Sequence, residues 1–166
     1  METVRANRSV DTVTGVFATK TDAENAYRTL LKMGYQPDEV TLIMSEETCR
    51  KLYEASCSDL GNEMSERQKH KLQVTRISEA LDVFGSYVAI PGLALVVAGD
   101  LGGSAARAIT SSVLSDDYAE YFQRRIQDGE ILIDFGLHAA RERKTIMGVW
   151  ETYGGMPLSR KVSNAA

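Results

Sequence analysis

Residues 12–44 constrain the fold of this chain more than any other stretch, because they contain a complete strand–helix–strand signal. The sequence TVTGVFATKTDAENAYRTLLKMGYQPDEVTLIM begins with a short run at 12–18 that carries apolar residues on both sides. Such a run is typical of an interior strand that is covered on both faces. Residues 40–44 form a second apolar run that we expect to be the next strand.

The helix between these strands is predicted from its cap, its apolar stripe and its stop. Thr21 and Glu24 have the spacing of a capping box, in which a hydroxyl and a carboxylate satisfy exposed amides. Gly34 supplies a left-handed stop, and Pro37 prevents the helix from resuming. The stripe at helical spacing comprises Ala23, Ala26, Tyr27, Leu30 and Leu31.

The rest of the chain gives further elements, and a segment from Glu130 to Gly154 repeats the strand–helix–glycine order of the first unit. The expected elements are a short helix at 46–55, a helix at 66–84 with its apolar stripe in the second half, a strand at 93–98, a helix capped by Ser115 and stopped by Gly129, a strand at 130–135 and a last helix at 139–153 that ends at Gly154.

This order predicts an α+β protein of the ferredoxin-like plan: two βαβ halves that form a four-stranded antiparallel sheet with helices on one face. A doubly wound parallel sheet ranks second because it needs more strands in regular alternation. We expect one domain over 1–166, with a core at 12–45 and 88–154, a helical insertion at 46–87, an added C-terminal helix, and flexible tails at 1–10 and 156–166.

Residues 83–99, VFGSYVAIPGLALVVAG, contain no charged side chain and raise the question of a membrane span. A spanning helix needs about 20 apolar residues, whereas this stretch is shorter and contains Ser86, Pro91 and three glycines. A buried strand reached through a Pro91-Gly92 turn is the better interpretation. Membrane contact through 83–99 is kept as the minor alternative.

Composition narrows the class of protein. A net charge of −4 argues against general nucleic-acid binding, which needs a basic face. Cys49 and Cys57 fit free thiols in the cytoplasm, and neither they nor His70 and His138 have the spacing of a metal site. The N-terminus lacks the apolar segment of a signal peptide. We therefore expect a cytoplasmic protein without metal or cofactor.

The turn at 99–103 is the candidate ligand site. Gly99, Gly102 and Gly103 lie between an expected strand and a helix start, where backbone amides can hold a phosphate, and Arg107 could supply a counter-charge. The turn matches neither dinucleotide nor Walker loops, and Asp100 would repel an anion. Tight turning and close packing are the competing explanation for these glycines.

Other reactive residue types give weaker signals. Asp134 lies among apolar residues of an expected strand and could be a tuned acid, but an outward or paired carboxylate is the commoner case. His138 is expected at a solvated helix start, and Cys49 in a packing role beside acidic residues that disfavour its thiolate. Trp150 is expected in the core. No catalytic triad or acid–base pair is visible, so no catalytic residue is assigned.

Three stretches resemble the bacterial general stress protein family, also described as heat-induced stress proteins of the YflT type. They are residues 13–44, IPGLALVVAGDLGG at 90–103 and LSDDYAEYFQRRIQDGEILIDF at 114–135. The chain departs from this family in its insertion after Cys49 and in a short Gly/Ala stretch. The resemblance implies a cytoplasmic setting in a stress response and little chemistry, because the family has no settled activity.

We therefore expect a non-enzymatic, stress-associated interaction or regulatory protein that self-assembles as a homo-oligomer through an open sheet face or edge. The alternative is a ferredoxin-like domain that senses a small ligand, either an anion or a nucleotide.

Overall fold

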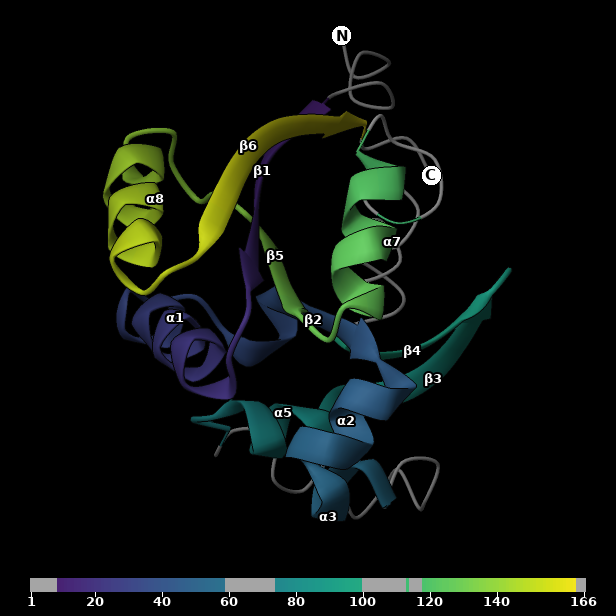
Figure 1. Cartoon of the computed structure of the whole chain (residues 1–166). Coiled ribbons are helices and arrows are strands. Elements are labelled where there is room, and N and C mark those ends of the chain that lie inside the picture. The colour runs from purple at the N-terminus through teal and green to yellow at the C-terminus, as the bar shows by residue number, and fades with distance from the viewer. Residues whose placement is uncertain (1–8, 59–73, 100–112, 114–117, 164–166) are drawn as a thin grey trace, which may run out of the picture.

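The computed structural model describes residues 9–58, 74–99, 113 and 118–163 of the chain. These residues form an antiparallel sheet with helices on both of its faces (Figure 1). The elements are, in chain order, β1 (Ser9–Phe17), α1 (Lys20–Lys32), η2 (Pro37–Glu39), β2 (Val40–Ser45), α2 (Glu46–Leu52), α3 (Glu54–Ser58), α5 (Ile77–Phe84), β3 (Gly85–Ile90), β4 (Leu93–Ala98), α7 (Ala119–Gln127), β5 (Ile131–Gly136), α8 (Glu142–Thr152) and β6 (Met156–Ser163).

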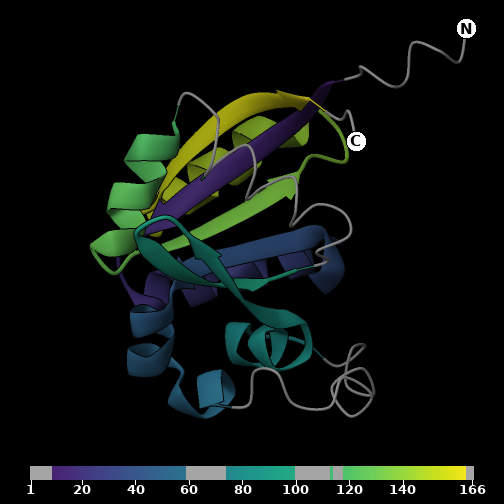
Figure 2. The same cartoon turned by 90° about the vertical axis from the view of Figure 1, so that its right-hand side faces the viewer.

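The sheet has six strands in the order β3-β4-β2-β5-β1-β6, and every neighbouring pair is antiparallel. Strands β1 and β2 are joined by α1 but are separated in the sheet by β5. In the same way, β5 and β6 are joined by α8 but are separated by β1. Two strand–helix–strand units therefore interlock around β1 and β5, and Figure 2 shows these strands side by side.

The α+β class and the antiparallel sheet are confirmed, but the sheet has six strands rather than four. The second βαβ half was expected to run from the strand at 93–98 to the strand at 130–135, and this placement is wrong. The second strand–helix–strand unit consists of β5, α8 and β6, and the strand at 93–98 is β4, the partner of β2. Helices were expected on one face only, yet α7 lies on the face opposite α1 and α8 (Figure 1). The expected flexible tail is wrong for residues 156–163, which form β6 and pair with β1.

Two hydrophobic clusters hold these layers together, one on each face of the sheet. The larger cluster lies between the sheet and helices α1, α5 and α8, and includes Phe17, Leu30 and Trp150. The smaller cluster includes Phe122 and Ile126 of α7. Because successive residues of a strand point to opposite faces, each central strand contributes to both clusters.

Within the stretch 83–99, residues 83–84 end α5 and residues 85–98 form a β-hairpin. Strands β3 and β4 pair along their full length, and Gly92 has φ +80° in the turn that follows Pro91. Proline followed by a left-handed glycine is the sequence of a type II turn. Within the described part of the chain, no helix has the length and apolar character needed to cross a membrane.

Candidate functional site

Only one of the four residues predicted to bind a ligand falls within the described ranges. Gly99 follows β4 directly and is buried. Gly102, Gly103 and Arg107 lie outside the described residues, as do Asp100, His70 and the cap residue Ser115. The proposed phosphate-binding turn therefore stays a prediction.

Asp134 is buried at the centre of the sheet, which differs from the expected outward orientation. Its strand, β5, lies between β1 and β2, and the register places Asp134 directly opposite Thr14 on one side and Thr41 on the other. The Thr14 hydroxyl donates a hydrogen bond to Asp134 Oδ1 at 2.5 Å. Thr12, two residues before Thr14, is also buried, so the smaller-cluster face contains a polar patch of four residues.

Burial decides what this polar patch can do. Asp134 is 1% exposed, and Thr14 and Thr41 are completely covered. A hydroxyl beside a carboxylate resembles a nucleophile with its base, but such a pair acts only where a substrate can reach it. We therefore interpret the Thr14–Asp134 pair as an internal polar contact that fixes the register of β1 against β5.

A second polar cluster surrounds Tyr35, which the sequence did not single out. The Tyr35 hydroxyl donates to Glu142 Oε1 at 2.5 Å and accepts the backbone N–H of His138 at 3.1 Å. The His138 ring stacks on the Tyr35 ring, with centroids 4.0 Å apart, and its Nε2 lies 2.5 Å from Glu39 Oε1. Burial, followed by the hydrogen bond to the Glu142 carboxylate, raises the pKa of Tyr35 to about 12.

This cluster joins the loop after α1 to the start of α8. His138 is exposed, as expected, but it lies four residues before α8 rather than at its first turn, and its ring contacts Tyr35 and Glu39. The sequence does hint at the position of Tyr35, because it follows the glycine that stops α1, and a residue at that position commonly packs back on its helix. Nothing in the sequence could show that its hydroxyl meets Glu142, which lies 107 residues away.

The two cysteines are free and buried, as expected for a packing role. Burial, followed by contact with the Cys57 thiol, raises the pKa of Cys49 and so disfavours its reactive thiolate. The Tyr87 hydroxyl donates to the Cys57 carbonyl at 3.1 Å. The cysteines therefore help to pack α2 and α3 together, and Tyr87 ties β3 to α3.

The two edges of the sheet differ in their chemistry. Strand β3, GSYVAI, contains neither a charged residue nor a proline, and Tyr87 is 46% exposed. Strand β6, MPLSRKVS, contains Pro157, Arg160 and Lys161. Charges and proline are the usual means of preventing an edge strand from pairing with another chain. Among the described strands, β3 is outermost and pairs with β4 alone.

The sheet faces offer no comparable surface. On the smaller-cluster face, Val16, Ile43 and Leu132 are each 1% exposed or less. On the opposite face, α1 and α8 cover Phe17 and Ile133. The sequence had suggested an uncovered face as a reason for self-assembly; within the described residues that reason applies to the edges only.

No cluster of three or more histidine, cysteine, aspartate or glutamate side chains in the described ranges could hold a metal ion. Comparison with known proteins gives no relative, because no family model, no curated protein and no solved structure matches this chain. The functional proposal therefore rests on the geometry of the described residues.

Proposed function

We propose that this protein is a non-enzymatic interaction or regulatory module that assembles with itself by pairing strand β3 of two copies. The observation that carries the proposal is the uncharged, proline-free edge from Ser86 to Ile90. Backbone N–H and C=O groups along such an edge are a template for another strand, and their pairing joins two sheets into one.

A second copy is the occupant that suits this edge best. A two-fold axis beside β3 places the strand antiparallel to itself, which is a closed and self-complementary arrangement. Every residue in the pair then faces an uncharged residue, so no like-charge repulsion opposes contact. The same pairing through β6 would bring two copies of Arg160 and Lys161 close together.

We also propose a more specific assignment of the fold. We assign β1-α1-β2 and β5-α8-β6 as a ferredoxin-like core, with the β3–β4 hairpin added beside β2. The added hairpin supplies the assembling edge. A stress-associated, cytoplasmic role rests on the sequence resemblance and on the two free thiols Cys49 and Cys57, and stays a prediction.

Light scattering combined with size-exclusion chromatography tests the assembly. We expect the wild-type mass to rise from the 18.3 kDa of one chain toward twice that value as concentration increases. Ala89 is an exposed residue of β3, so Ala89→Lys introduces a charge at the edge without disturbing the core. This variant should stay monomeric at concentrations where the wild type associates.

The matched control is Ser159→Lys, which places the same charge at an exposed position of the other edge strand, β6. It should associate like the wild type. A wild-type protein that stays monomeric at every concentration would refute the proposal. Equal loss of association in both variants would contradict an interface formed by β3.

A further inference from the structure

A groove of about 660 Å³ lies beside the C-terminal half of α1, and its chemistry is independent of the β3 edge. Leu31 of α1, Val74 and Phe84 contribute apolar walls. The loop after α1 closes one end through Tyr35 and Pro37. Pockets that hold small molecules typically measure about 300–1,000 Å³ and have largely apolar linings, so the size and lining are suitable.

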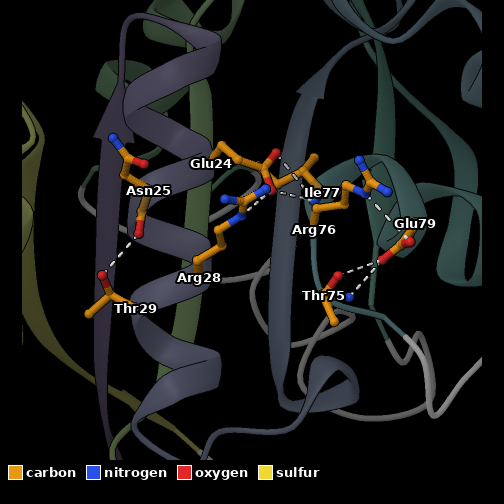
Figure 3. A network of polar contacts seen from close by, with 8 residues as sticks. All are labelled: Glu24, Asn25, Arg28, Thr29, Thr75, Arg76, Ile77 and Glu79. Atoms are coloured by element: carbon orange, nitrogen blue, oxygen red, sulfur yellow. Dashed lines mark hydrogen bonds and ion pairs between the residues drawn. The ribbon is translucent and has the colours of Figure 1, made fainter.

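The walls of this groove are held in place by a defined contact between α1 and α5. Glu24 of α1 accepts the backbone N–H of Ile77, the first residue of α5, at 3.2 Å (Figure 3). Thr75, which lines the groove, donates its own N–H and hydroxyl to Glu79 at 2.7 Å and 3.0 Å. The bond to Ile77 joins the start of α5 to α1, and the bonds to Glu79 hold Thr75 against the first turn of α5.

The charges on the groove favour an anion. Arg28 and Lys32 lie one helical turn apart on α1, and both are exposed. Arg28 Nε lies 3.5 Å from Glu24, whose carboxylate also accepts the Ile77 amide (Figure 3). Lys32 makes no ion pair within the part of the chain that the structure describes. Asp38, the acidic lining residue, belongs to η2 and not to this cationic wall.

We propose that this groove binds a small amphipathic anion, with its apolar body against Leu31, Val74 and Phe84 and its charged group at Arg28 and Lys32. The charged group can be a carboxylate, a sulfonate or a phosphate, because each accepts hydrogen bonds from guanidinium and ammonium donors. The residues that line this groove are not those of the Gly99–Gly103 turn that the sequence suggested.

A pair of fluorescent probes tests both parts of the proposal. Anilinonaphthalenesulfonate has an aromatic body and an anionic group, whereas phenylnaphthylamine has a similar body and no charge. We expect the full chain to bind one sulfonate probe saturably. Lys32→Glu should weaken that binding about tenfold, by replacing an attraction with a repulsion, and should leave binding of the neutral probe unchanged.

Lys51→Glu is the control for net charge, because Lys51 is an exposed lysine of α2 that does not line the groove. It should leave binding of both probes at the wild-type level. Octanoate should displace the sulfonate probe, and octanol should displace it far less. The absence of saturable binding, equal weakening by Lys32→Glu and Lys51→Glu, or equal competition by octanoate and octanol would each overturn the proposal.

Discussion

At the scale of single residues, the fold depends on positions whose neighbours are distant in the sequence. Gly15 lies in the central strand β1, and a Cβ atom built there would be 2.5 Å from the Trp150 ring. Trp150 is itself completely buried and stacks edge-on against Phe17 and Phe135. The absence of a side chain at Gly15 is therefore what allows α8 to pack on the sheet.

Gly15→Ala should destabilise the protein by about 1–3 kcal/mol, because the Trp150 ring has to move within a packed core. Gly148→Ala is the matched control: Gly148 is an exposed glycine of α8 with open space around it. That substitution should raise stability by roughly 0.5–1 kcal/mol, since alanine loses less backbone entropy in a helix. Urea unfolding of the two variants measures the difference, and equal effects would contradict the assigned packing.

A second matched pair of substitutions tests the polar patch around Asp134. Thr14→Val removes the hydroxyl that donates to the buried Asp134 carboxylate and should cost about 1–3 kcal/mol. Thr41 lies on the other side of Asp134, and its buried hydroxyl has no hydrogen-bond partner among the described residues. Thr41→Val should therefore be neutral, or stabilising by up to about 1 kcal/mol. Thermal unfolding that shows a larger loss for Thr41→Val would contradict this assignment.

At the scale of elements, the sequence predicts helix ends better than helix starts. The glycines expected to stop three helices, Gly34, Gly129 and Gly154, all have positive φ angles and end α1, α7 and α8. A left-handed glycine is a local requirement and is therefore visible in the sequence. The buried stripe of Ala23, Ala26, Tyr27 and Leu30 is likewise confirmed.

The start of α1 differs from its prediction. Thr19, not Thr21, accepts the N–H of the helix's first turn, from Asp22 at 3.1 Å. Glu24 does not reach back to its own helix, because its carboxylate caps α5 instead. Thr19 and Thr21 are both suitable cap residues by local pattern. The capping box with Thr21 needs the Glu24 carboxylate, which contacts the start of α5 instead. Local pattern could not reveal a partner 53 residues away.

Glu24→Ala should loosen α5, because the amide of Ile77 loses its acceptor and Arg76 offers no side-chain cap. We expect a cost of about 1 kcal/mol, the usual value of an N-terminal cap, and faster hydrogen exchange at Ile77 and at the residues of α5 that follow. Glu47→Ala, at an exposed acidic position of α2, should change neither. Unchanged exchange at Ile77 in Glu24→Ala would contradict the cap.

At the scale of the whole molecule, the sequence predicts the α+β class but not the arrangement of the strands. Strand β6 was missed because it contains Pro157 and Lys161, which are residue types depleted in strands, and because its partner β1 is far away in the sequence. Strand β3 was hidden inside the apolar run 83–99, where strand and helix cannot be separated by periodicity. These two strands are the outermost strands of the described sheet, so the sequence could not indicate which strands form its edges.

The most direct test of the account is the distance between two copies, measured by pulsed electron paramagnetic resonance with one spin label per chain. Cys49 and Cys57 are buried, so labels can be introduced at Ala89→Cys on β3 or at Ser159→Cys on β6. If two β3 strands pair, labels at residue 89 should lie within about 20 Å of each other, and labels at residue 159 about 50 Å apart, across a continuous sheet with strands spaced about 4.8 Å. Short distances at residue 159, or no dipolar coupling from residue 89, would contradict it.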